Sequence, residues 1–97
     1  MPFIFYDGVP YFQIRHAIYC KKCMDTIESN YRYDFKYCSC RTIGIAGGIS
    51  RGNRILGNLL DMESRCMYMA IIHKKKVFLP KYLVDIELGR NANIRTE

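Results

Sequence analysis

The sequence has no tryptophan, only two histidines and no long apolar segment. His16 and His73 lie far apart along the chain, and neither is accompanied by a nucleophile with an oriented base. The glycine-rich segment 44–48 matches neither phosphate-binding fingerprint. We therefore predict that the protein is not an enzyme and has no small-molecule substrate.

No apolar stretch approaches the roughly 18 residues that cross a bilayer, so no membrane partner is expected. The first eight residues lack the basic and long apolar regions of a signal peptide. We therefore expect a cytoplasmic, reducing environment. In such an environment the five cysteines indicate a metal site or free thiols before disulfides.

Acidic residues are scarce: 9 Asp and Glu face 15 Lys and Arg, a formal net charge of +6. This balance argues against an acidic protein that imitates DNA. A basic surface suits nucleic acid, an acidic protein face or an anionic membrane. It also serves solubility alone.

With 97 residues the chain has room for one domain, 1–97, and for a modest core. Its hydrophobic content of 49% is enough for folding. Small scaffolds commonly need disulfides or a metal to offset conformational entropy. The cysteines are the residues that could supply such a constraint.

Alternation of apolar and polar residues predicts short strands. Residues 3–6 are apolar, Asp7-Gly8 is a two-residue turn signal, and a second strand begins at Val9. Between residues 11 and 19 one face is predicted to carry Phe12, Ile14, His16 and Ile18. Further strands are expected at 26–28, 35–37, 42–45, 67–72 and 77–79.

Two segments later in the chain give different periods. An apolar stripe at helical spacing between Ser50 and Cys66 predicts one or two short helical turns. Clean alternation from Tyr82 to Leu88 predicts a half-buried strand that Gly89 ends, followed by a frayed tail at 90–97. The helical stripe consists of Ile55, Leu56, Leu59 and Leu60.

Four cysteines form the strongest motif. Cys20 and Cys23 make a C-x2-C pair, and Cys38 and Cys40 a C-x-C pair. Two such pairs at adjacent hairpin ends can supply four thiolates in a tetrahedron to one structural Zn²⁺, which leaves no open position for catalysis. The second pair and the spacer are shorter than in the standard zinc-ribbon pattern, and Met24 and Arg41 stand where glycine is common. Disulfides and free core thiols remain as alternatives.

The fold class predicted is α+β: mostly short antiparallel strands, one short helix and a zinc-ribbon-like module at about 14–46. Cys66 is expected to be a buried apolar thiol. His16 is expected to be a half-buried histidine with a backbone partner, and the alternatives are a group beside the metal or a replacement ligand. The carboxylates Asp25, Glu28 and Asp34 are best explained by surface solubility. Basic and aromatic residues interleave and suit nucleic acid, a protein interface or plain surface: Lys21, Lys22, Tyr31, Arg32, Tyr33, Lys36, Tyr37, Arg51 and Arg54.

Residues 16–68 resemble a domain of small uncharacterised proteins from phages and mobile elements of Gram-positive bacteria. The segments that carry the resemblance are 16–23, 26–29, Asp34-Phe35, 38–40, Gly47-Gly48 and Arg54 with Gly57-Asn58. The resemblance implies phage origin and metal binding more than a particular activity.

The whole chain is also similar to zinc-binding anti-CRISPR proteins of streptococcal phages, which act on type II-A Cas9. This similarity implies a non-enzymatic inhibitor in the host bacterial cytoplasm that binds Cas9 and hinders its engagement of target DNA. A nucleic-acid-binding zinc ribbon of a phage is the alternative, and its affinity for DNA would fall steeply with salt.

Overall fold

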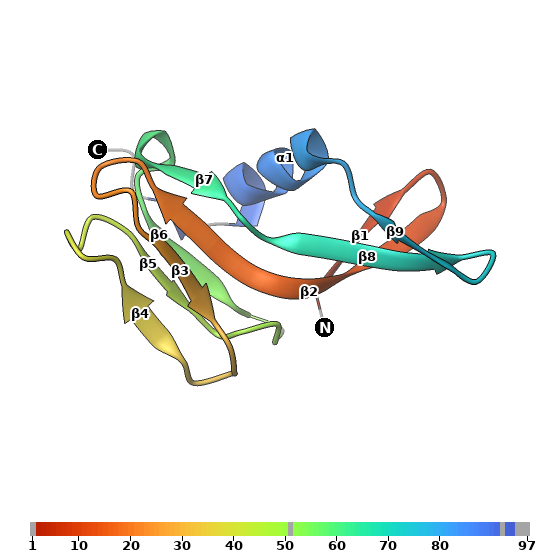
Figure 1. Cartoon of the computed structure of the whole chain (residues 1–97), viewed down its shortest axis with the longest axis horizontal. Coiled ribbons are helices and arrows are strands. Elements are labelled where there is room, and N and C mark those ends of the chain that lie inside the picture. Colours follow the sequence, from red (N-terminus) through yellow and green to blue (C-terminus); the bar gives the residue numbers. More distant parts are fainter. Residues whose placement is uncertain (1, 51, 92, 95–97) are drawn as a thin grey trace.

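A computed structural model describes residues 2–50, 52–91 and 93–94. Short, mostly antiparallel strands and one α-helix make up the fold (Figure 1), which confirms the predicted class. No helix in these residues is long and apolar enough to cross a membrane. The elements are β1 (Phe3–Tyr6), β2 (Val9–Cys20), β3 (Thr26–Ser29), β4 (Phe35–Tyr37), β5 (Gly44–Ala46), β6 (Arg54–Gly57), the 3₁₀ turn η1 (Leu59–Asp61), β7 (Met62–Ser64), β8 (Met67–Ile72), β9 (Lys75–Phe78), α1 (Lys81–Asn91) and β10 (Asn93–Ile94).

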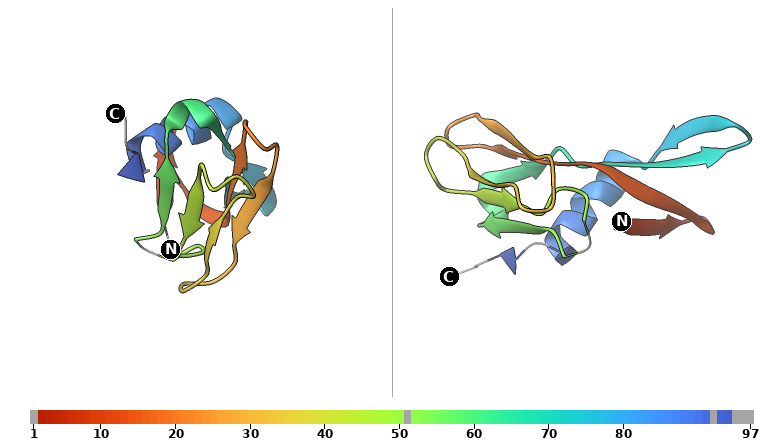
Figure 2. Two further views of the ribbon diagram at one scale, coloured as in Figure 1. Left: turned by 90° about the vertical axis from the view of Figure 1, so that its left-hand side faces the viewer. Right: turned by 90° about the horizontal axis from the view of Figure 1, so that it is seen from below.

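Strand β2 pairs with four other strands and connects the two ends of the molecule. Its first half pairs with β1 and β8, and its second half pairs with β3 and β7. The first half and its partners project as an arm with the order β1-β2-β8-β9 (Figure 1). A second sheet, β10-β6-β5-β4, lies beside the second half of β2 (Figure 2). The molecule is consequently elongated, at 43 × 25 × 21 Å.

A β-bulge in β2 changes which side of the strand is buried. Gln13 pairs with Tyr68 and Arg15 with Met67, so Ile14 is an extra residue opposite β8. One extra residue reverses the period-2 alternation. The prediction of a single continuous face for this strand is therefore wrong: Phe12 and Ile14 are exposed, whereas His16 and Ile18 are buried.

The segment expected to form one or two helical turns contains one, the 3₁₀ turn η1. It lies between two strands, β6 and β7, that were not expected there. Ile55 is buried and Leu60 is exposed, so the stripe is not a common buried face. Gly57 has φ 123°, and a Cβ there would lie 2.9 Å from the Thr42 carbonyl oxygen, which explains glycine at the end of β6.

The predicted strand at 82–88 is instead helix α1. Val84 and Leu88, four residues apart, are buried, whereas Tyr82 and Ile86 are exposed. Residues at i and i+4 lie on the same side of a helix, so Val84 and Leu88 are buried together where α1 packs on the sheet. The alternation of apolar and polar residues along 82–88 therefore does not decide the secondary structure. Gly89 lies within α1 and does not end the element. In the tail predicted to fray, β10 pairs in parallel with β6, while residues 92 and 95–97 lie outside the described residues.

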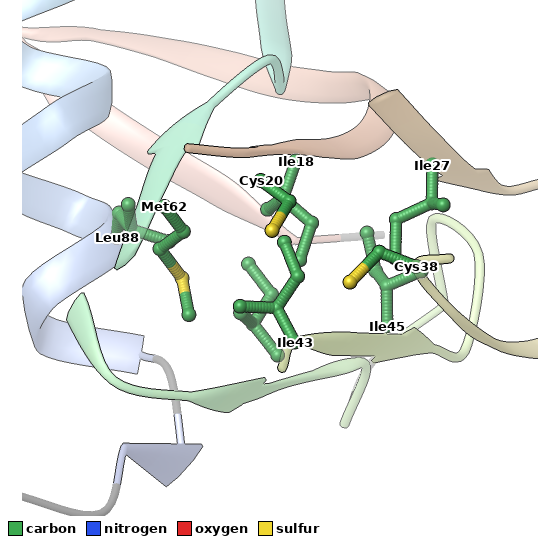
Figure 3. Close-up of a cluster of buried hydrophobic side chains, with 9 residues drawn as sticks. Ile18, Cys20, Ile27, Cys38, Ile43, Ile45, Met62 and Leu88 are labelled. Carbon is green, nitrogen blue, oxygen red and sulfur yellow. The ribbon is translucent and has the colours of Figure 1, made fainter. Parts of the chain in front are cut away.

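Two apolar clusters form the core. One lies in the arm, between the sheet and α1, and includes Tyr11, Tyr68 and Val84. The other lies between the two sheets and includes two of the cysteines, Cys20 and Cys38 (Figure 3). The cysteine motif is therefore part of the second core.

Candidate metal centre

The four cysteines come from two turns on different sheets. Cys20 ends β2 and Cys23 lies in the turn before β3, while Cys38 follows β4 and Cys40 lies in the turn before β5. Their Sγ atoms all lie within 4.8 Å of one another. The structure thus brings together the four residues that the spacing singled out.

The first turn is held by its backbone. The Cys20 N–H donates to the Asp25 carbonyl at 2.8 Å, and the Lys21 N–H donates to the Asp61 carbonyl at 2.9 Å. The backbone N–H groups of Lys22 and Cys23 hydrogen-bond to the Cys20 sulfur. Amides aimed at a sulfur stabilise its thiolate form.

The second turn is built in a similar way. The Cys38 N–H donates to the Ile43 carbonyl at 3.1 Å, and the Arg41 N–H donates to the Cys38 carbonyl at 2.9 Å. The Cys40 Sγ lies 3.0 Å from the Thr42 hydroxyl oxygen. This turn therefore holds two sulfurs on one side of the chain.

The residue after each cysteine pair adopts a left-handed conformation. Met24 has φ 57° and Arg41 has φ 60°. These are the two positions where glycine was expected and is missing. The turns keep a backbone shape that suits glycine, at a conformational cost of about 1–2 kcal/mol per residue.

An acidic side chain joins the two turns. The Asp25 carboxylate accepts hydrogen bonds from the Ser39 backbone N–H at 3.2 Å and from the Ser39 hydroxyl at 2.9 Å. Asp25 was predicted to be a solubility residue, and this contact gives it a structural role instead. Its place two residues after Cys23 is the only sequence signal for that role.

The sulfur spacing fits one metal ion. Cys40 Sγ lies 3.6 Å from both Cys20 Sγ and Cys38 Sγ. A disulfide would bring two sulfurs to about 2.05 Å. Tetrahedral Zn²⁺ with bonds of about 2.3 Å would separate its sulfurs by about 3.8 Å. The arrangement therefore matches a tetrathiolate site, and all five cysteines are unpaired.

Two thiols of the cluster, those of Cys20 and Cys40, differ strongly in pKa. Burial raises the pKa of Cys20 to about 11. Hydrogen bonds from the Thr42 hydroxyl and backbone N–H lower the pKa of Cys40 to about 6. Cys40 is also exposed, so it offers an incoming cation the most accessible thiolate.

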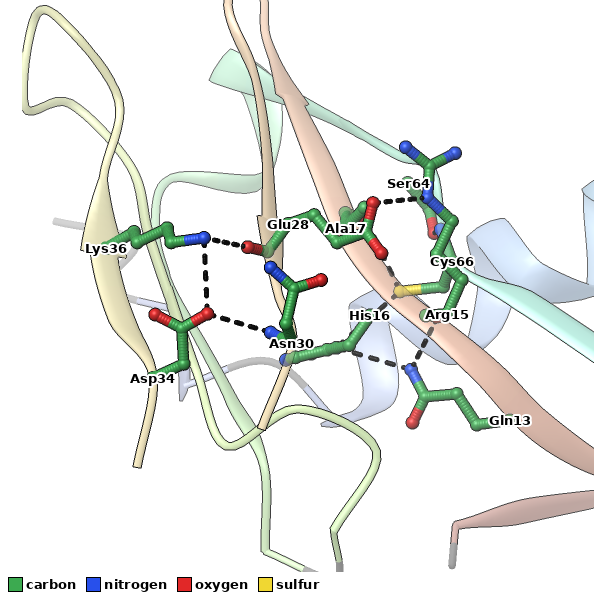
Figure 4. Close-up of polar contacts among 10 residues, drawn as sticks. All are labelled: Gln13, Arg15, His16, Ala17, Glu28, Asn30, Asp34, Lys36, Ser64 and Cys66. Carbon is green, nitrogen blue, oxygen red and sulfur yellow. Dashed lines mark hydrogen bonds and ion pairs between the residues drawn. The ribbon is translucent and has the colours of Figure 1, made fainter. Parts of the chain in front are cut away.

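His16 lies outside the cysteine cluster, beside Gln13 and Cys66 (Figure 4). Hydrogen bonds of its ring join strands β2, β5 and β6. Its Nε2 lies 3.1 Å from the Ala46 carbonyl and 3.2 Å from the Arg54 carbonyl, so this nitrogen carries the proton. Its Nδ1 then accepts from the Gln13 amide at 3.2 Å and from the Cys66 thiol at 3.7 Å. His16 thus has the expected backbone partners, but it is fully buried and not half-buried as predicted.

Cys66 is half-buried and also lies 3.4 Å from the Ala17 carbonyl. Burial raises the pKa of its thiol. Cys66 belongs to no cluster of metal-binding side chains among the residues that the structure describes. The expected buried thiol is therefore shielded but not purely apolar in its contacts.

The remaining predicted carboxylates are paired, which surface solubility alone does not explain. Glu28 lies 3.0 Å from Arg15. Asp34 is buried, accepts from the Asn30 N–H at 2.8 Å and lies 3.2 Å from Lys36 Nζ. Backbone hydrogen bonding by Asn30 keeps the pKa of Asp34 below its usual value.

The basic and aromatic residues divide into two groups. Lys36 is engaged by Asp34, whereas Arg32 and Arg54 line an open hollow of about 230 Å³ beside Tyr33. Tyr33 is 81% exposed, and the Arg32 guanidinium lies 5.6 Å from its ring centroid. His73 lies exposed in the β8–β9 turn, and Arg51 lies outside the described residues.

Comparison with known proteins finds a family match over part of the chain. No curated protein and no solved structure matches the chain. Residues 13–56, which include all four clustered cysteines, match a family described as a domain of unknown function, DUF7695.

Proposed function

We propose that the four cysteines bind one structural Zn²⁺ and that the protein is a non-enzymatic binding module. The convergence of four sulfurs within 4.8 Å carries this proposal. Soft thiolate ligands in a tetrahedron select Zn²⁺ over hard cations. Four protein ligands would fill the coordination sphere, so the ion would hold two turns together rather than activate water.

Metal analysis of the purified chain tests the zinc proposal. We expect one zinc per chain, and Co²⁺ substitution should give the intense visible bands of a tetrahedral thiolate complex. Cys38→Ser should lose this spectrum. Cys66→Ser is the matched control and should keep it, because Cys66 lies outside the cluster. A metal-free protein that folds normally would contradict the proposal.

The partner that we propose is a Cas9-type effector of a bacterial host, bound by a phage-encoded inhibitor in the host cytoplasm. Support comes from the resemblance to zinc-binding anti-CRISPR proteins, from the net charge of +6, and from exposed tyrosine and arginine side chains. A basic inhibitor is expected to bind a less basic face of the effector than its nucleic-acid channel.

The zinc-loaded chain should then co-elute with guide-loaded Cas9 in gel filtration. It should also reduce binding of target DNA by the effector. The chain mixed with DNA alone should give no mobility shift. Failure to co-elute would contradict the inhibitor proposal.

A nucleic-acid-binding role is the second candidate, favoured by the Arg32–Arg54 hollow. Neither guanidinium has an ion-pair partner in the described residues, and exposed Tyr33 can stack on a base. A mobility shift that weakens with salt and is lost in Arg32→Gln would assign the role to nucleic acid. Arg65→Gln is the control, because Glu63 already pairs with that guanidinium.

A further inference from the structure

The arm sheet is apolar on both faces, although α1 covers only one. The buried face packs Tyr11 and Tyr68 against Val84 of α1. On the opposite face, strand pairing aligns one row across all four strands. Phe3 pairs with Phe12, Phe12 with Met69, and Met69 with Phe78. Directly paired residues point to the same side of a sheet, so this row forms one continuous surface.

This surface, which we call the phenylalanine face, is exposed. Phe3 is 47%, Phe12 42% and Phe78 49% exposed. Phe5 and Ile71, two residues along their strands on the same side, are 66% and 61% exposed. Four of the chain's five phenylalanines thus lie on one uncovered side of a sheet.

The exposed area is large for so small a protein. The exposed fractions of the four phenylalanines amount to about two whole side chains, or about 400 Å². That area alone equals a typical monomer's largest apolar patch, and it supplies about half of the roughly 800 Å² that each partner contributes to a standard interface. Ile71 and Met69 add to it.

The charges at the end of the arm suit self-association. The β1–β2 turn carries Asp7, and the neighbouring β8–β9 turn carries Lys74, with Lys75 and Lys76 beginning β9. Both turns lie at the same end of the sheet (Figure 1), on its two opposite edges. None of these four residues forms an ion pair within the part of the chain that the structure describes.

We propose that two copies of the chain pair through the phenylalanine face, about a two-fold axis that runs along the strands. Such an axis reverses the strand order of the second copy. Phe3 of one copy then faces Phe78 of the other, and Phe12 faces Met69. The same rotation brings Asp7 of each copy toward the lysine-bearing edge of the other. Two sheets packed in this way would lie about 10 Å apart, as in a β-sandwich, and the cysteine end of each copy would stay free.

Sedimentation equilibrium of the full chain across the micromolar range tests the proposal. We expect a dimer, with association weakened more than tenfold in Phe12→Lys and in Phe78→Lys. Both side chains are half exposed, so these variants should keep the circular dichroism spectrum and metal content of the wild type. Leu60→Lys, at a 79% exposed leucine outside the arm, is the matched control and should dimerise normally.

Charge reversal tests the orientation of the two copies. Asp7→Lys should weaken the dimer, and adding Lys75→Asp and Lys76→Asp to it should restore association. A monomer at every concentration would overturn the proposal, as would a dimer that tolerates both phenylalanine variants. Binding of a monomer to phosphatidylserine-containing vesicles, lost in Phe12→Lys, would overturn it in favour of a membrane surface.

Discussion

Two residues in the cysteine turns occupy a backbone region that costs free energy for any side chain. Met24 and Arg41 both have φ near 60°, and each directly follows a pair of cysteines. The turn geometry needs this conformation to direct two sulfurs to one point. A residue other than glycine therefore lowers the stability of the fold at both positions. Both side chains are exposed.

Met24→Gly should stabilise the fold by about 0.5–1 kcal/mol, because glycine adopts positive φ without strain. Urea unfolding in the presence of zinc measures the change. Lys21→Gly, at an exposed residue of the same turn without positive φ, is the control and should slightly destabilise the protein. Equal destabilisation by both substitutions would contradict this account of the turn.

His16 should make the free energy of unfolding depend on pH. Burial lowers the pKa of His16 below 6.5, the ordinary value that applies in the unfolded chain. As pH falls below about 6.5, the unfolded chain gains a proton that the folded His16 resists, so stability falls. The loss continues until the pH reaches the lowered pKa of the folded state.

Urea unfolding of the wild type and of His16→Gln at saturating zinc, between pH 7.5 and 5, measures this effect. Both proteins share the pH dependence of metal binding, so their difference isolates His16. The wild type should lose more stability than the variant over this interval. Parallel curves would show that the histidine stays neutral in both states.

At the scale of elements, the loop between β5 and β6 packs backbone against backbone. A Cβ on Gly48 would lie 2.8 Å from the Tyr31 carbonyl carbon, and φ at Gly48 is 55°. This close approach brings the β5–β6 loop against the turn between β3 and β4. It ties the loop to the turn that connects the two sheets.

Gly48→Ala should therefore destabilise the protein by about 2 kcal/mol or more, since both the backbone strain and the contact act against it. Gly52→Ala is the control, because Gly52 has φ 83° but nothing within 4 Å of an added Cβ. It should cost only about 1 kcal/mol. Thermal unfolding compares the two, and equal losses would show that the close contact has no energetic weight.

The elements also show what sequence reasoning could reach. The N-terminal hairpin and the returning strand β3 follow from local turn residues and alternation. The convergence of four cysteines from two sheets follows from their spacing in pairs, which is typical of one metal ion. The helix at 81–91 does not, because Val84 and Leu88 satisfy a strand period and a helix period equally well. The helix is favoured by its packing on one face of the arm sheet, a tertiary contact that the local pattern does not contain. The contact between Asp25 and Ser39 is likewise tertiary, and its only signal in the sequence is that Asp25 lies two residues after Cys23.

At the scale of the whole molecule, the cysteine site sits in one of two cores that share β2 and α1. Structural zinc in small peptides contributes about 10–16 kcal/mol, as much as the whole stability of a typical domain of about 5–15 kcal/mol. Chelation by EDTA should thus unfold at least residues 18–45, where Cys20, Ile27, Cys38 and Ile45 pack together.

Hydrogen–deuterium exchange measured by mass spectrometry locates this unfolding. Peptides from 18–45 should exchange much faster after chelation and recover their protection when zinc is restored. Cys66→Ser should behave like the wild type in both conditions. Unchanged exchange in this segment would mean that apolar packing alone holds the cysteine end.

The bulge at Ile14 makes the number of residues in β2 decide which of its side chains are buried. It points Phe12 of the first half outward and Cys20 of the second half inward, although both belong to one continuous strand. Inserting or deleting a single residue between the bulge and Cys20 would exchange inside for outside at the sulfur end. Length changes in this stretch are therefore compatible with the fold only in steps of two residues. Related chains that vary here should differ by even numbers, whatever side chains they carry.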